Sequence, residues 1–308
     1  MSKIVIILKK VRKQYRHHKY LDSSYTFINR NRGKEKYLIV LSGYKEYLYD
    51  IVFGRLKAFL PEDIDVCLIT SGKYDRKISQ IAENNRWSYL YTKKNKIAIA
   101  QNLAIKINPC AKYIYKMDED IFLTSRSFEN LQNTFEYVKT YGESDIGFVA
   151  PLIPLNGYGY MKILEEYNLK DLYSEKFEKP LYSSYPTKKI ISDPEVAQFF
   201  WGKGGYIDNI DELNKHFQDK KPIYYYCPIR FSIGFIYFTR DIWEGMGMFR
   251  TVMGSGLGVD EEQICSYCVV KSLPMIISGN SVVGHFSFGP QTPKMIEYLN
   301  SAMEYYRV

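Results

Sequence analysis

The feature that most constrains this sequence is an alternation of apolar, β-branched runs with segments of helical periodicity between residues 37 and 120. Strands are expected at residues 37–41, 66–70, 87–91 and 113–117, and helices at residues 45–59, 75–84 and 97–107. Repeated strand–helix alternation favours an α/β fold, a mostly parallel sheet with helices on both faces. Ligands of such sheets bind beyond the carboxyl ends of the strands, so a site is expected at that edge.

Three acidic side chains, Asp118, Glu119 and Asp120, directly follow the fourth expected strand. Crowded carboxylates repel one another unless a cation offsets their charge. A divalent cation does this and also neutralises a diphosphate by bridging its oxygens. Because side chains alternate along an extended segment, Asp118 and Asp120 are expected to point to one side and Glu119 away. An acidic loop without chemistry is the alternative.

The segment from Asn95 to Asp120 resembles the nucleotide-sugar half of GT-A fold glycosyltransferases, in which an Ala- and Asn-bearing helix precedes a strand that ends in a D-x-D-type motif. The resemblance is carried by Asn95, Lys96, Ala98, Ala100, Asn102, Ala104 and the run from Tyr113 to Asp120. A glycine that the family usually has near that helix start is absent. The resemblance covers residues 37–120 and 230–290, and it implies a Rossmann-like GT-A domain of the family 2-like, bacterial surface polysaccharide type.

Two later segments fit the same family. Asp260 and Glu261 begin an expected helix that runs to Val270, and the resemblance implies that one of them is the general base of an inverting enzyme. Acids in a first helical turn also complement the helix dipole without any catalysis. His285 follows an apolar strand, and the resemblance implies that it completes a metal shell with Asp118 and Asp120, since imidazole suits Mn²⁺ beside carboxylates. A purely structural histidine is the alternative.

The resemblance also implies a donor-binding set with a UDP-sugar as donor and Mn²⁺ or Mg²⁺ as cofactor. Ser42 and Gly43 end the first expected strand, where the base and ribose would lie, and Asp75 would accept a hydrogen bond from uracil. Asn102, Asp118 and Glu119 complete this set. Ser and Gly are also common in turns for purely structural reasons.

The basic residues are concentrated at one end of the chain. Residues 1–36 contain eleven Lys or Arg and two acidic residues, a net charge of +9 in a chain whose total is +8. We expect a basic N-terminal arm that is either solvated or bound to anionic lipid, through Lys9, Arg12, Lys13, Arg16 and Lys19. No apolar run of bilayer length and no signal-peptide pattern is found, which predicts a cytoplasmic protein. If the arm binds anionic lipid, the protein is expected to be peripheral at the inner face of the plasma membrane.

The remaining chain is expected to form one domain with two halves. Residues 37–150 are assigned to the nucleotide-sugar-binding half, and residues 151–308 to the acceptor-binding half. Prolines, glycines and aromatic residues crowd residues 151–230, which predicts an irregular, loop-rich insert that recognises the acceptor. A further strand is expected at residues 231–238 and a helix at residues 241–246.

Together these features predict a metal-dependent hexosyltransferase that moves a sugar from a nucleotide diphosphate sugar to a hydroxyl of a glycan or lipid-linked acceptor in capsule or related polysaccharide synthesis. A haloacid dehalogenase-like phosphohydrolase also has a D-x-D motif, but with Thr or Val where Phe122 stands. A nucleotidyltransferase would have a glycine-rich basic loop, which Ser42-Gly43-Tyr44-Lys45 matches poorly. A nucleic-acid-binding protein without enzymatic activity would explain the basic arm but not the acidic cluster.

Overall fold

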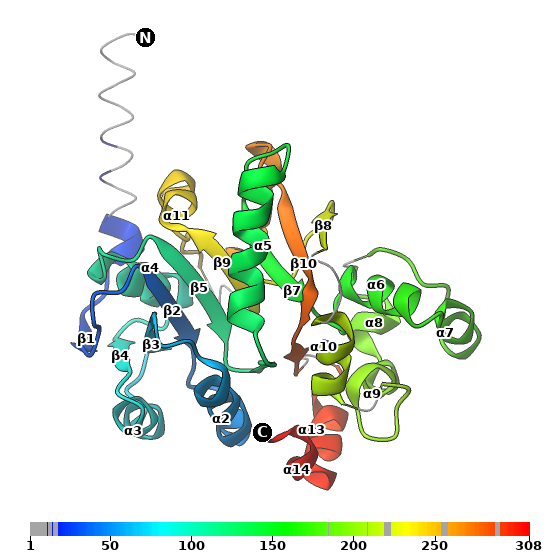
Figure 1. Ribbon diagram of the computed structural model, residues 1–308. Coiled ribbons are helices and arrows are strands. Elements are labelled where there is room, and N and C mark those ends of the chain that lie inside the picture. The colour runs from blue at the N-terminus through cyan, green and yellow to red at the C-terminus, as the bar shows by residue number, and fades with distance from the viewer. Residues whose placement is uncertain are drawn as a thin grey trace. The chain divides into compact units, whose positions relative to one another are not determined.

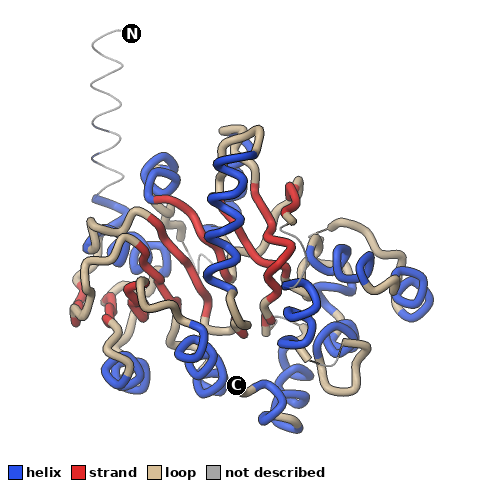
Figure 2. The backbone as a smooth tube through the Cα atoms, in the orientation of Figure 1, coloured by secondary structure: helices blue, strands red, loops and turns tan. Residues whose placement is uncertain are grey.

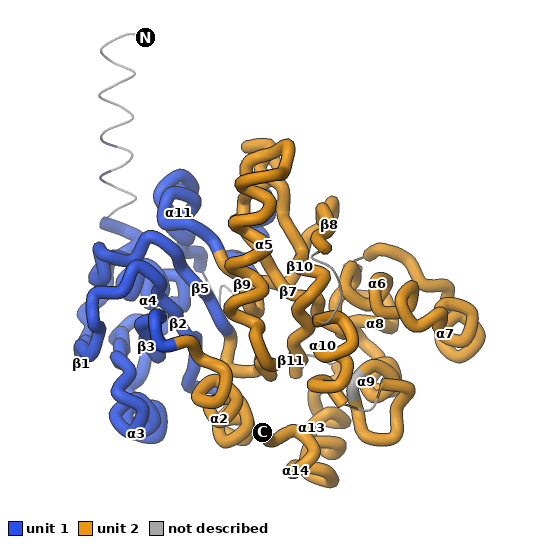
Figure 3. Tube along the Cα trace, in the orientation of Figure 1, with its two compact units in different colours: residues 1–44, 62–117, 238–267 blue, residues 45–61, 118–237, 268–308 orange. Residues whose placement is uncertain are grey.

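The computed structural model describes residues 11, 14, 18–183, 185–207, 209–218, 223–253, 258–286 and 290–308. Two compact units alternate along the chain (Figure 3). The first comprises residues 1–44, 62–117 and 238–267, and the second comprises residues 45–61, 118–237 and 268–308. Both contain helices and strands (Figure 2).

The first unit is built on parallel strands. It contains β1 (Tyr25–Ile28), β2 (Lys36–Leu41), β3 (Ile64–Ser71), β4 (Ser88–Thr92) and most of β5 (Tyr113–Asp118), in the order β1-β4-β3-β2-β5 (Figure 1). The pairs β2–β3 and β3–β4 are parallel, whereas β1 is antiparallel to β4. Its helices are α3 (Arg76–Asn84), α4 (Ile97–Ile107), α11 (Arg240–Met246) and most of α12 (Val259–Val270).

Burial in this unit explains why its strands read as continuous apolar runs. Every residue of β3 is buried, as are Leu38, Ile39 and Val40 of β2. Helix α4 packs against β2, β3 and β4. Strands that are buried on both faces need apolar residues at consecutive positions rather than at alternate ones.

The second unit contains two sheets. Strands β9 (Phe235–Thr239, which ends in the first unit), β7 (Phe148–Leu152), β10 (Met275–Val282) and β8 (Tyr224–Cys227) follow one another in that order. Strand β7 is parallel to β10, whereas β9 is antiparallel to β7 and β8 to β10. A small second sheet pairs β6 (Ile121–Phe122) with β11 (Gly284–His285). Helix α5 (Ser127–Tyr141) packs on β7 and β10, and η1 (Glu46–Leu48), α2 (Tyr49–Phe59), α13 (Thr292–Ser301) and α14 (Met303–Tyr306) also belong to this unit.

The prediction of an irregular, loop-rich insert is wrong, because residues 159–218 form several short helices. These are α6 (Gly159–Glu166), α7 (Lys170–Lys176), α8 (Lys189–Ser192), α9 (Pro194–Trp201) and α10 (Ile210–Gln218). Two of these residues bound a helix: Pro194 occupies the first turn of α9, and Gly202 follows its last residue. Some of the aromatic residues are buried among the helices, and the ring centroids of Tyr160 and Tyr173 lie 5.7 Å apart.

The predicted α/β class, with a mostly parallel sheet flanked by helices, is confirmed. The strand expected at residues 231–238 begins only at Phe235. Part of the expected basic arm, Tyr25–Ile28, forms β1, while Lys9, Arg12, Lys13 and Arg16 lie outside the described residues. Within the described part of the chain, every helix falls short of the length and apolarity needed to cross a membrane.

Candidate active site

The acidic motif lies in a tight turn between β5 and β6. Asp118 ends β5, and Glu119 and Asp120 form the turn. The backbone N–H of Asp118 donates to Gly234 O (2.8 Å), and that of Phe286 donates to Asp120 O (2.8 Å). Because the segment is a turn, the alternation predicted for an extended strand does not hold. Glu119 and Asp120 are instead both buried, with 6% and 2% of their surface exposed.

Two nitrogen groups converge on one oxygen of Asp120. The Lys45 ammonium donates a hydrogen bond to Asp120 Oδ2, and His285 Nε2 lies 3.3 Å from the same oxygen. The small sheet positions the histidine, because β11 pairs His285 with Ile121, the residue after Asp120. The structure therefore brings Asp120 and His285 together and adds Lys45.

The charges of this cluster stabilise one another. Burial raises the pKa of Asp120, but His285 and Lys45 lower it further than burial raises it, so the carboxyl pKa lies well below its usual range. For Lys45, burial lowers the pKa of the ammonium. The negative charges of Asp120 and Asp118 raise it by more, so the pKa of Lys45 lies above its usual value. At neutral pH the cluster contains a carboxylate and an ammonium.

An aromatic residue lies beside this pair. Burial is the main cause that raises the pKa of Tyr47, and the Asp120 carboxylate adds to it. The Tyr47 ring meets Phe286 edge to face, with centroids 6.0 Å apart, and remains 40% exposed. An exposed ring next to a charged pair is suited to contact a bound ligand.

The expected metal shell of Asp118, Asp120 and His285 is not assembled as a three-donor group. Across the described ranges, no three His, Cys, Asp or Glu side chains gather as an ion would require. The Asp120 oxygen is bonded to an ammonium, which repels a divalent cation. In this arrangement the residues do not fit a resident Mn²⁺ or Mg²⁺, and the expected ion stays a prediction.

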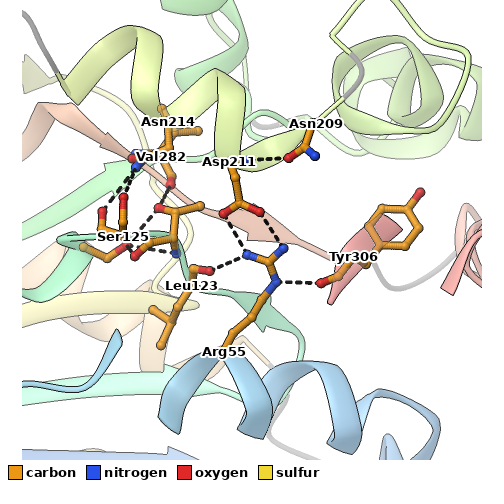
Figure 4. A network of polar contacts seen from close by, with 10 residues as sticks. Arg55, Leu123, Ser125, Asn209, Asp211, Asn214, Val282 and Tyr306 are labelled. Carbon is orange, nitrogen blue, oxygen red and sulfur yellow. Dashed lines mark hydrogen bonds and ion pairs between the residues drawn. The ribbon is translucent and has the colours of Figure 1, made fainter. Parts of the chain in front are cut away.

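A buried arginine network supports the segment that follows β6 (Figure 4). Arg55 of α2 has no exposed surface and donates to both carboxylate oxygens of Asp211, at 2.9 and 2.7 Å. It also donates to the carbonyl oxygens of Leu123 (2.9 Å) and Tyr306 (2.7 Å). Leu123 directly follows β6, so this network fixes the strand that pairs with His285.

The candidate base Asp260 lies in the first unit, in the first turn of α12. Its Oδ2 accepts a hydrogen bond from Gln101 Nε2 (2.9 Å) and lies 3.9 Å from Lys116 Nζ. Asp260 lines a cavity of about 10 Å³, room for about one water. Glu261 is partly exposed and does not line this cavity. Gly256 and Leu257, which precede the helix, lie outside the described residues.

Three residues expected to bind the donor have structural roles in the first unit. The Ser42 hydroxyl donates to Val40 O (3.2 Å). Gly43 has φ +113°, a conformation that L-residues rarely adopt. Asp75 is the N-cap of α3 and accepts from Ile78 N (3.1 Å). The structure thus explains each residue type without a nucleotide.

Asn102, also expected at the donor, instead ties α4 to the segment around α11. Its side chain is fully buried, and Oδ1 accepts from Trp243 Nε1 (3.0 Å) and Phe249 N (2.9 Å). Its Nδ2 donates to Phe249 O (2.8 Å) and Tyr20 O (3.0 Å). Because these bonds use the full capacity of the amide, the donor-binding role predicted for Asn102 is not supported.

Lys45 is the member of the Asp120 cluster that sequence reasoning missed. The position of Lys45 after the Ser42-Gly43 turn can be read in the sequence, but the adjacency of β2 and β5 is known only from the strand order of the structure. A basic residue just past one strand and an acidic motif just past its neighbour are candidates for an ion pair.

A second cavity lies on the helical insert of the second unit. It has a volume of about 620 Å³, within the range of about 300–1,000 Å³ that is typical of ligand pockets. It is lined by Tyr167, Tyr206, Ile207, Asn209, Glu212, Leu213, Lys215 and His216. The rings of Tyr167 and His216 lie 4.8 Å apart, and His216 Nε2 is 3.0 Å from Glu166 Oε1.

Comparisons with known proteins assign the chain to no family. No protein-family model matches the chain, and no curated protein sequence matches it. A solved structure that is similar to part of it is a cytidylyltransferase from Leptospira borgpetersenii, with 17% identity and a TM-score of 0.28. The match spans 38% of this chain and 53% of the cytidylyltransferase chain, and a likeness at this level carries no argument about activity.

Proposed function

We propose that this chain is a glycosyltransferase that moves a sugar from a nucleotide diphosphate sugar, a UDP-sugar, to a hydroxyl of a glycan or lipid-linked acceptor. The observation that carries the proposal is the buried Asp120 just beyond the end of β5. One of its two carboxylate oxygens, Oδ2, contacts both Lys45 and His285. The resemblance of residues 95–120 to GT-A enzymes supports the same assignment.

Lys45 and His285 are suited to stabilise a diphosphate leaving group. Departure of a nucleoside diphosphate places negative charge on its terminal oxygens, and positioned donors stabilise that charge. Asp120 orients both nitrogen groups through one oxygen, and the Lys45 side chain keeps 22% of its surface exposed to meet a ligand.

The transfer itself requires a base for the acceptor hydroxyl. In an inverting reaction the acceptor oxygen forms a bond to the anomeric carbon while the bond from that carbon to the diphosphate oxygen breaks. The electron pair leaves with the nucleoside diphosphate, and the hydroxyl proton passes to a carboxylate. Asp260 is the better candidate than Glu261, because its carboxylate is buried and is oriented by Gln101.

The acceptor is proposed to bind in the 620 Å³ cavity of the helical insert. Tyr167 and Tyr206 offer aromatic faces for the apolar side of a sugar ring, while Asn209 and Glu212 offer hydrogen-bonding groups for its hydroxyls. This mixture of aromatic and polar side chains suits a saccharide better than a wholly apolar molecule.

The proposal is tested by incubating the protein with UDP-glucose, UDP-galactose and UDP-N-acetylglucosamine and detecting released UDP by mass spectrometry. We expect slow hydrolysis of at least one donor, lowered about a hundredfold or more in Asp120→Asn. Asp171→Asn, on an exposed position of α7, is the matched control and should leave hydrolysis unchanged. Full hydrolysis by Asp120→Asn, or neither hydrolysis nor binding of any donor, would refute the proposal.

A further inference from the structure

The cation position beside Asp120 is filled by a side chain of the protein itself. Lys45 and His285 both contact Asp120 Oδ2, an atom of a carboxylate that is only 2% exposed. Asp118 lies close enough for its charge to act on Lys45. The acidic motif that would ordinarily call for a bound ion is therefore compensated by an ammonium.

A divalent ion at the same carboxylate would meet the positive charge of Lys45. It would have to displace or repel the Lys45 ammonium, whose positive charge is held beside two carboxylates.

We infer that Lys45 takes the place of the divalent metal in this site, so that the chain binds the diphosphate of a nucleoside diphosphate through the Lys45 ammonium without Mn²⁺ or Mg²⁺. An ammonium has three N–H donors and a single compact charge, which suits phosphate oxygens. His285 provides a second donor from β11. The choice of a nucleoside diphosphate as ligand rests on the proposed function, whereas the exclusion of metal rests on the geometry alone.

The first arm of the test examines metal. Mn²⁺ is titrated with the wild-type protein, and the signal of free aqueous Mn²⁺ is followed by electron paramagnetic resonance. The signal is expected to equal that of a buffer control. A fall in the free Mn²⁺ signal with the wild-type protein would mean that the ion binds. If the full signal returns with Asp120→Asn, the ion binds at Asp120 and the inference is overturned.

The second arm examines UDP by isothermal titration calorimetry, in EDTA and in Mn²⁺. Affinity is expected to be the same in both conditions and to fall about ten- to hundredfold in Lys45→Met, the loss of one charge-assisted contact. Lys45→Arg retains the cation and should stay close to the wild type. Lys57→Met, on the exposed face of α2, is the matched control. Unchanged affinity in Lys45→Met would contradict the inference, and circular dichroism of each variant identifies misfolding.

The two arms separate the inference from the proposed function. UDP binding that requires Mn²⁺ would overturn the role of Lys45 and leave a glycosyltransferase in place. Failure to bind UDP in either condition would remove the proposed function, and the Mn²⁺ titration alone would then decide whether the site excludes metal.

Discussion

At the scale of the residue, Asp120 determines the character of the site. A buried carboxylate is costly unless its charge is compensated, and here two nitrogen groups contact one of its oxygens. The same contacts that orient Lys45 and His285 also contribute to folding, so Asp120 should link stability to pH in a defined direction.

Replacing Asp120 by Asn should lower the free energy of unfolding by about 2–4 kcal/mol at pH 7, because Lys45 and His285 lose their charged partner. The pKa of Asp120 is lowered in the folded protein, so the stability that its charge contributes is present above the unfolded-state value of about 3.8 and is lost as pH falls below it. Urea unfolding of both proteins at pH 7 and pH 3 measures this. A difference that persists undiminished at pH 3 would contradict the account.

The two candidate bases can be separated by matched amide substitutions. Asp260→Asn should lower the transfer rate about a hundredfold or more, because its buried carboxylate is oriented by Gln101. Glu261→Gln should change it by about threefold or less, since this side chain is partly exposed. Steady-state transfer assays with a fixed donor compare the two, and the reverse ranking would assign the base to Glu261.

At the scale of the element, the sequence predicts regular structure well and its connections poorly. The strands and helices of residues 37–117 can be predicted from their apolar patterns. Strand β3, for example, is buried along its whole length and is therefore a mostly continuous apolar run in the sequence. The small sheet of β6 and β11 could not be predicted, since each strand has only two residues and no pattern of its own. Lys45 was missed for a related reason: its partner lies 75 positions away in the sequence.

The Arg55 network should be necessary for both stability and the site. Arg55→Met removes the donor to the partly exposed Asp211 carboxylate and to the Leu123 carbonyl, and should lower the free energy of unfolding by about 1–3 kcal/mol. Lys57→Met, exposed on the same helix, should change it by about 0.5 kcal/mol or less. Chemical denaturation measures both, and equal effects of the two substitutions would refute a structural role for the network (Figure 4).

The helical insert offers a separate test of acceptor binding. Tyr206→Ala removes an aromatic face from the 620 Å³ cavity and should raise the acceptor KM about tenfold, while the donor KM stays unchanged. Tyr185→Ala, a substitution of an exposed tyrosine that does not line the cavity, is the control. A rise in the donor KM alone would place the acceptor elsewhere.

At the scale of the whole molecule, the two units are interleaved along the chain. The chain passes from one unit to the other at residues 44/45, 61/62, 117/118, 237/238 and 267/268. The pairs that define each unit are correspondingly distant in sequence: Asn102 bonds Trp243 and Phe249, and Arg55 bonds Asp211. Apolar periodicity along the chain predicts the local elements, but such long-range pairs have no signature in a single sequence.

This interleaving predicts that a cut at residues 150/151 yields no folded fragment. Residues 1–150 lack α11 and α12, so the buried amide of Asn102 loses Trp243 and Phe249, and an unsatisfied buried amide costs about 1–3 kcal/mol at each lost partner. Residues 151–308 lack α2 and α5, so Asp211 loses Arg55 and strand β10 loses one of the two helices that pack on it. Both fragments should show no cooperative thermal transition and no near-ultraviolet circular dichroism, in contrast to the full chain. A cooperative transition in residues 1–150 alone would show that the donor half of the chain folds without the segment around α11, and that the Asn102 contacts are dispensable.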